Sequence, residues 1–165
     1  MSSLVHYSSV SKDGLYAVAY EEAVRGLAEQ QRVAESFRTR AGLLFSAGAI
    51  TASFLGAVAL RGSSTSLASW LALLSFVAVA GASLAILWPR KWERAANPRD
   101  VIETYIESEN PAPLENLHRD LSLHMHDSYL ENQAGIEQFA ALLQISSGFL
   151  TLEVVLWIAA IATAG

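Results

Sequence analysis

Residues 139–164 read FAALLQISSGFLTLEVVLWIAAIATA, a run of twenty-six residues in which only Gln144 and Glu153 interrupt the small and apolar side chains. Two further stretches carry no charge, and they cover residues 41–60 and 67–88. A bilayer core of about 30 Å needs about 20 helical residues, because each residue adds about 1.5 Å to the helix. The sequence therefore predicts an all-α membrane protein with transmembrane helices at 41–60, 67–88 and 139–164.

The polar segments outside these spans predict the remaining organisation. Residues 1–40 are expected to form a tail and then an amphipathic helix, and residues 89–138 a helical segment between the second and third spans. Asn97 and Pro98 are typical of a helix start, which predicts a short helix up to about Glu107. No proline separates either long polar helix from its span. We therefore expect a cytoplasmic helical bundle that is formed by extensions of spans one and three.

A heptad pattern runs along the first helix and includes one polar residue, Gln30. Spacings of three and four place such residues on one stripe of a helix, which is then buried against a partner helix. The partner is either another helix of the same subunit or a second subunit, and the pattern allows both. We call this stripe the seam; it consists of Tyr16, Tyr20, Ala23, Leu27, Gln30, Ala34, Phe37, Ala41 and Leu44.

Small residues form a second line in the first span. Gly48, Ala52 and Gly56 are spaced four apart and lie on one face of a helix. Small side chains let two helix backbones approach closely, and this packing stabilises helix association in lipid. We therefore expect this line to pack against another helix.

The distribution of Lys and Arg predicts the orientation of the chain. Cytoplasmic flanks of membrane spans are enriched in these residues. They occur before the first span (Arg25, Arg32, Arg38, Arg40) and after the second (Arg90, Lys91, Arg94, Arg99), whereas the first connection has only Arg61 and the C-terminal end has none. The predicted N-terminus is cytoplasmic and the predicted C-terminus lies outside.

The sequence contains no recognisable enzyme motif. There is no P-loop, no GxSxG and no HExxH, and the absence of cysteine excludes thiol chemistry. His124 and His126 point about 200° apart on a helix and cannot share an ion. The net charge of −5 argues against a nucleic-acid partner. We expect a non-enzymatic protein with no metal and no cofactor.

Glu153 is the one ionisable residue within the predicted spans. On insertion scales, an acidic residue at the centre of a span has a free-energy cost of membrane insertion of about +2.5 to +3.5 kcal/mol. Its side chain should therefore face other helices or water. Three roles remain open: a protonated group that bonds to a hydroxyl such as Thr51, a residue that lines an oligomeric pore, or a proton-linked switch. Gln144 lies half a turn away and is not expected on the same stripe.

Three arginines are candidates for binding an anionic ligand. Arg38 and Arg40 precede the first span, and Arg119 lies in the later polar helix. The planar guanidinium group can bond phosphate in a bidentate manner. The alternative is that Arg38 and Arg40 only anchor the span at the membrane surface.

Short motifs in this chain resemble those of a known group. They are Arg38-Thr39-Arg40-Ala41-Gly42 at the first span, Trp88-Pro89-Arg90 at the end of the second, and Asp120-Leu121 with His126 before the third. The chain resembles the Pycsar membrane effectors and, more loosely, the SLATT-type effectors of bacterial anti-phage defence. In mid-span it departs from the pattern, with Ala49-Ile50-Thr51 where the family has a small residue and Asn. The resemblance implies a homo-oligomer in the bacterial inner membrane that is activated by a cyclic nucleotide.

These observations together predict an oligomeric inner-membrane effector or pore that is gated through its cytoplasmic helices. Membrane lipid, further copies of the chain and a cyclic nucleotide would be its partners. The alternative is a non-enzymatic membrane scaffold or regulatory subunit that binds a protein partner.

The charge distribution leads to a test of topology. We expect a reporter fused after Gly165 to behave as an extracytoplasmic domain, because the third span carries the chain outward. A paired phosphatase and fluorescent-protein fusion would measure this. Cytoplasmic behaviour of the fusion would contradict the three-span arrangement.

Overall fold

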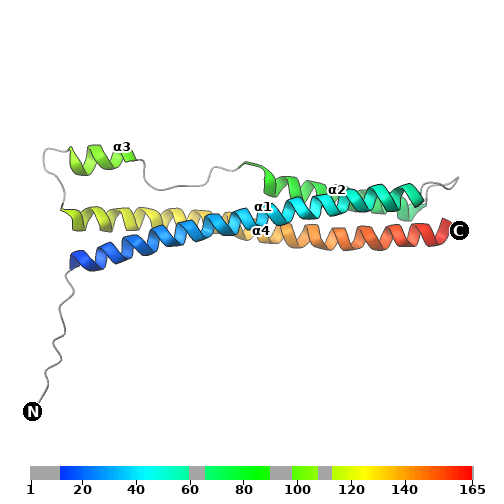
Figure 1. The fold of residues 1–165 in the computed structure, drawn as a ribbon, viewed down its shortest axis with the longest axis horizontal. Helices are drawn as coiled ribbons and strands as arrows, with labels where there is room; N and C mark the ends of the chain where they lie inside the picture. The colour runs from blue at the N-terminus through cyan, green and yellow to red at the C-terminus, as the bar shows by residue number, and fades with distance from the viewer. Residues whose placement is uncertain (1–11, 60–65, 90–97, 108–112, 165) are drawn as a thin grey trace, which may run out of the picture. The chain divides into compact units, whose positions relative to one another are not determined.

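The computed structural model describes residues 12–59, 66–89, 98–107 and 113–164. The elements in these ranges are all helical (Figure 1): α1 (Lys12–Ala59), α2 (Leu67–Leu87), α3 (Pro98–Val101), the π-helix η1 (Ile102–Ile106) and α4 (Leu114–Ala164). Three of them, α1, α2 and α4, contain apolar stretches long enough to cross a membrane. The predicted all-α class and the three candidate spans are therefore confirmed, and they indicate a multi-pass membrane protein.

Some sequence predictions concern residues outside the described ranges. These are the tail before residue 12, the cap at Asn97 and the flanking residues Arg61, Arg90, Lys91 and Arg94. The short helix predicted after Asn97 is present from Pro98, and its second part is a π-helix.

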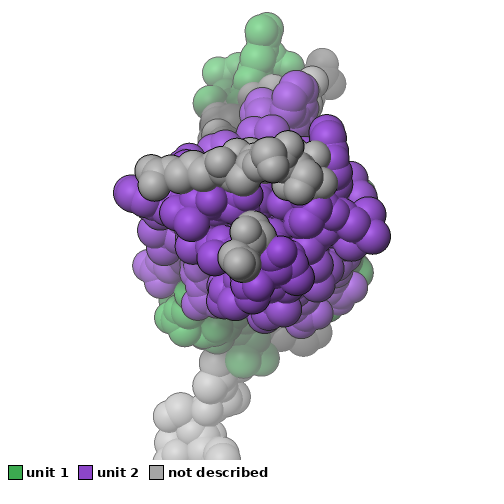
Figure 2. Space-filling view, turned by 90° about the vertical axis from the view of Figure 1, so that its right-hand side faces the viewer, with its two compact units in different colours: residues 1–31, 92–133 green, residues 32–91, 134–165 purple. Residues whose placement is uncertain are grey.

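The chain forms two compact units, which Figure 2 shows in different colours. The first unit comprises residues 1–31 and 92–133, and the second comprises residues 32–91 and 134–165. Both α1 and α4 contribute residues to each unit, because each is one uninterrupted helix. Neither helix contains a proline, which would remove a backbone hydrogen bond and kink it. The predicted continuity of both polar helices into the apolar segments is confirmed.

In the first unit, α1 and α4 run side by side in the same direction. The rings of Tyr20 and His118 stack with centroids 5.4 Å apart. Ten residues further along α1, the amide nitrogen of Gln30 donates a hydrogen bond of 2.9 Å to the main-chain oxygen of Tyr129. Residue numbers increase together along the two helices, so the pair is parallel. Leu27 and Met125 are buried in this unit.

The seam on α1 is used within the chain. Leu27, Gln30, Ala34 and Ala41 are buried, and the other five seam residues are half-buried. This burial confirms the alternative in which the seam packs inside one subunit. The structure gives no support to a seam between subunits, because these side chains are already covered.

The π-helix η1 contacts α4 in the first unit through one hydrogen bond. The hydroxyl group of Tyr105 donates to Oδ2 of Asp120 over 3.0 Å. This hydrogen bond, partial burial and the negative charge of Asp120 raise the pKa of the Tyr105 phenol. A raised pKa means that the folded protein favours the neutral phenol. The hydrogen bond is therefore present at pH values below the ordinary tyrosine pKa of about 10, and it is lost as the pH rises through the higher pKa of the folded state.

The second unit packs α2 against the apolar parts of α1 and α4. Ser66 caps α2 by accepting a hydrogen bond from the backbone nitrogen of Ser69. One core cluster joins all three helices through Ala59, Ala72, Trp157 and Ala160. The hydroxyl groups of Ser83 and Ser146 lie 3.3 Å apart and are buried. Of these α2 residues, Ala72 packs beside the C-terminal end of α4, and the later residue Ser83 packs beside the middle of α4. The two helices are therefore antiparallel.

The line of small residues on α1 packs as predicted. A Cβ atom added at Gly48 would lie 3.4 Å from side-chain atoms of Phe76 and Val79 on α2, and one added at Gly56 would lie 3.2 Å from the ring of Trp157 on α4. Both glycines are buried, and Ala52 between them is half-buried. Both glycines therefore lie in tightly packed helix contacts, where a larger side chain would displace its neighbours.

This packing predicts unequal effects of two glycine substitutions. Gly56→Leu should destabilise the protein by about 1–3 kcal/mol, because its side chain would overlap the buried ring of Trp157. Gly148→Leu is the matched control, since nothing lies within 4 Å of a Cβ atom added there. The midpoint of unfolding by sodium dodecyl sulfate, followed by circular dichroism, measures both. Equal midpoints for the two variants would contradict the assigned packing.

Candidate functional site

Glu153 is fully buried in the second unit, with a relative exposure of 0%. Its carboxyl group lies against α1, because a Cβ atom added at Gly48 would be 3.3 Å from Oε2. Phe76 and Val79 of α2 surround the same point. Three helices therefore meet at one carboxyl group, and Gly48 provides the space for it.

The carboxyl group has no hydrogen-bond partner. Neither Oε1 nor Oε2 of Glu153 accepts a hydrogen bond of normal geometry, and the indole nitrogen of Trp157, which is also buried without such a bond, is the polar group that lies beside this carboxyl group. Trp157 follows Glu153 by four residues and lies on the same face of α4. The expected hydrogen bond from Thr51 to Glu153 is not formed, so that prediction is wrong. Thr51 lies three residues after Gly48, whereas the carboxyl group meets α1 at Gly48 itself.

The surroundings of Glu153 contain no charge to balance a carboxylate. Glu153 is the one charged residue in the stretches 41–60, 67–88 and 139–164. An unpaired charge in an apolar interior is far more costly than a neutral polar group. A neutral acid without a partner still costs about 1–3 kcal/mol. The arrangement therefore suits the protonated acid.

Two expectations for polar residues in the third span can be compared with their positions. The expectation that Glu153 lines a lumen is contradicted, because the side chain is enclosed by three helices of a single chain. Gln144 is exposed, whereas Glu153 is buried, so the two lie on different faces of α4 as predicted. Thr51 is half-buried on α1.

The three candidate arginines are divided between the units. Arg38 and Arg40 belong to the second unit, where Arg38 is half-buried and Arg40 is exposed, and Arg119 is exposed in the first unit. The Nε atom of Arg38 is buried and has no hydrogen-bond partner. No described contact joins Arg119 to the other two, and shared ligand binding by these residues stays a prediction. Among the described residues, no group of three or more His, Cys, Asp or Glu side chains could hold a metal ion.

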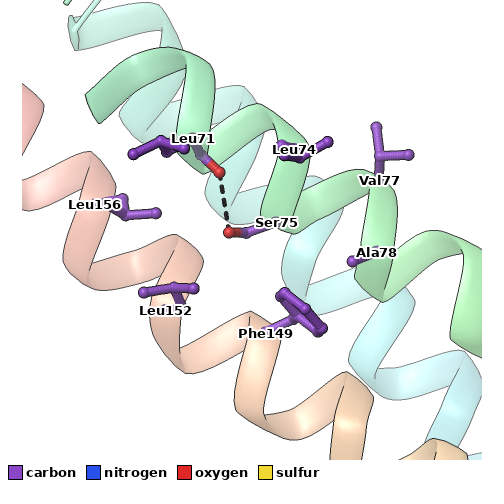
Figure 3. Close-up of a pocket in the computed structure, with 8 residues that line it drawn as sticks. All are labelled: Leu71, Leu74, Ser75, Val77, Ala78, Phe149, Leu152 and Leu156. Carbon is purple, nitrogen blue, oxygen red and sulfur yellow. Dashed lines mark hydrogen bonds between the residues drawn. The ribbon is translucent and has the colours of Figure 1, made fainter. Parts of the chain in front are cut away.

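An apolar groove lies between α2 and α4 in the second unit (Figure 3). Its volume is about 410 Å³. The hydroxyl group of Ser75 faces it, but this group donates to the main-chain oxygen of Leu71 over 2.9 Å. Ser75 therefore offers a ligand only the lone pairs of its oxygen, and the other side chains that line the groove are apolar. Sequence reasoning missed it, because its walls come from two helices whose contact no local pattern specifies. It is lined by Leu71, Leu74, Ser75, Val77, Ala78, Phe149, Leu152 and Leu156.

Comparisons with known proteins give no relative: no family model, no curated protein and no solved structure matches the chain. The resemblance of its short motifs to the Pycsar and SLATT-type effectors therefore stays a prediction.

The unpartnered carboxyl group leads to a prediction about stability. Glu153→Met should stabilise the protein by about 1 kcal/mol, because methionine has a similar length and removes an unsatisfied buried polar group. Leu152→Met is the control, since Leu152 is 45% exposed and its replacement should change little. Unfolding midpoints in one detergent at neutral pH give the comparison. A clear loss of stability in Glu153→Met would show that the carboxyl group has a partner.

Proposed function

We propose that this protein is an oligomeric effector of the bacterial inner membrane, in which the first unit controls membrane permeability through the second. The first unit would lie in the cytoplasm with the N-terminus, and the C-terminus would lie outside. An anionic ligand bound to the cytoplasmic part would start the response. Following the sequence resemblance, a cyclic nucleotide is the ligand we would test first.

The observation that carries this proposal is the continuity of two helices. Each of α1 and α4 is unbroken and supplies residues to both units. An α-helix is stiff along its axis, so a shift or rotation at one end displaces side chains at the other. Small helix shifts of this kind are a known way to couple distant parts of a protein. The proposal uses this coupling to link ligand binding with a change in the membrane.

The filled core of the second unit explains why several copies would be needed. Trp157, Phe139, Ile86 and Glu153 are large side chains with essentially no exposure. A single set of three helices packed in this way has no room for an aqueous path. Permeation would therefore take place between subunits or through damage to the surrounding lipid.

One observation favours the second candidate, a membrane scaffold or regulatory subunit. The seam, whose pattern allowed a contact between subunits, is buried within the chain at Leu27, Gln30, Ala34 and Ala41. A protein that stays monomeric would then act by binding a different protein. Its exposed polar helices could supply the contact surface.

A liposome assay tests the proposal. Purified protein in vesicles of phosphatidylethanolamine and phosphatidylglycerol should release an entrapped dye when cyclic CMP or cyclic UMP is added. The double variant Arg38→Gln/Arg40→Gln should need at least tenfold more nucleotide, because two cationic groups near the membrane surface are lost. Arg25→Gln is the control, since Arg25 is exposed and forms only a surface ion pair with Glu22.

Two results would contradict the effector function. One is the absence of dye release with every cyclic nucleotide tested. The other is a strictly monomeric protein after cross-linking in native membranes, which would leave the scaffold function. Linear AMP serves as the negative ligand control in both experiments.

A further inference from the structure

The carboxyl group of Glu153 combines three features that distinguish it from the other acidic residues whose side chains the structure describes. It is completely buried, both of its oxygen atoms lack a partner, and it lies where α1, α2 and α4 meet. Each feature is a property of the packing in the second unit. Together they raise the question of which ion or ligand this group could bind.

A metal ion does not fit this position. Cations such as Ca²⁺ and Mg²⁺ need about six oxygen ligands. Gly48, Phe76 and Val79 lie where the carboxyl group meets α1 and α2, and Trp157 lies beside it on α4; none of these side chains offers an oxygen. In the part of the chain that the structure describes, no group of three or more His, Cys, Asp or Glu side chains could hold a metal ion. The close contact with Gly48 also leaves no space for a hydrated ion. A proton is the one cation that this site can accept without further ligands.

The groups that face Glu153 do not titrate. Gly48 belongs to α1, Phe76 and Val79 belong to α2, and Trp157 lies one turn along α4. The uncharged stretches of these three helices contain no second ionisable side chain. A change in the protonation of this region is therefore a change at Glu153 alone.

We propose that Glu153 is a proton-binding site, and that the bound proton holds α1, α2 and α4 together in the second unit. When the proton leaves, the O–H bond breaks, its electron pair stays on the carboxylate, and a water molecule accepts the proton. The resulting charge needs hydration, which the packed contact with Gly48 cannot provide. The carboxylate therefore draws water into this contact and separates the three helices there. This inference does not depend on the effector function.

Trp157 provides a built-in reporter of this change, because it is fully buried beside Glu153. Replacing Trp70, Trp88 and Trp92 with Phe leaves it as the one tryptophan of the chain. In phosphatidylcholine vesicles titrated from about pH 5 to about pH 10, which covers buried carboxyl groups, its emission should shift to longer wavelength in one transition. The same protein with Glu153→Gln should show no transition, because its amide does not ionise.

Infrared spectroscopy follows the proton directly in the unmodified chain. A band from a protonated carboxylic acid should be present on the acidic side of the fluorescence transition and lost beyond it. Glu153→Gln should lack this band. If that variant fails to fold, Glu153→Met takes its place, because it also removes the acid.

Helix separation needs a reporter that a local change at Trp157 would not affect. The chain has no cysteine, so Ser146→Cys introduces a single thiol at a buried position on α4. Above the transition, a membrane-permeant maleimide should label this thiol at least threefold faster with Glu153 present than with Glu153→Gln. Below the transition the two rates should agree, which corrects for the pH dependence of the thiol.

Three outcomes would overturn the proposal. The first is identical fluorescence titrations with Glu153 and with the substituted residue. The second is an acid band that does not change with pH in the unmodified chain. The third is equal labelling of the Ser146→Cys thiol with Glu153 and with Glu153→Gln above the transition, which would show ionisation without helix separation. The dye-release assay is not used here, so failure of the effector function would leave these results unchanged.

Discussion

The contact between the Glu153 carboxyl group and Gly48 is the constraint on which the second unit depends. An apolar medium supplies no water to a polar group, so the protein itself must accommodate the carboxyl group. Gly48 leaves room for it, and Gly56, two turns further along α1, leaves room for the ring of Trp157. A larger side chain at either glycine would push α1 away from α4. The close packing of all three helices therefore depends on these two small residues.

Several hydroxyl groups in the same helices form hydrogen bonds locally, in contrast to the carboxyl group of Glu153. Ser53, Ser147 and Thr151 donate to carbonyl groups one turn earlier in their own helices, at 2.7–3.0 Å. Ser83 and Ser146 bond to each other between α2 and α4. A hydroxyl group is short enough for either solution, whereas the carboxyl group of Glu153 reaches past the backbone of its own helix. Its protonation state consequently becomes a property of the whole three-helix contact.

In the proposed function, the two long helices would be the route of communication. In the first unit, Gln30 and Tyr20 of α1 are joined to Tyr129 and His118 of α4 by specific contacts. In the second unit the same two helices are joined by the glycine contacts. Because neither helix is interrupted, a ligand that alters one set of contacts can alter the other. The proposed effector function needs this coupling, and the proposed proton site would act at its membrane end.

The sequence by itself determined the spans and the continuity of the helices. Long uncharged runs and the absence of proline act locally, so hydropathy and chain chemistry were enough to predict α2 and the extended α1 and α4. The packing of Gly48, Ala52 and Gly56 against other helices was also predictable, because small residues at a spacing of four let helices approach closely in lipid. The placement of Gln144 and Glu153 on different faces of α4 followed from helix geometry alone.

Only the tertiary structure decided which surfaces meet. The seam pattern from Tyr16 to Leu44 is the same for a partner in the same chain or in another, and burial against α4 resolved it. The sequence alone suggested a hydrogen bond between Thr51 and Glu153, but the rotation of α1 about its axis places Gly48 at the carboxyl group instead. The groove between α2 and α4 and the contact of Tyr105 with Asp120 were likewise not predictable. Such contacts depend on how helices rotate and cross, and side chains distant in sequence determine this together.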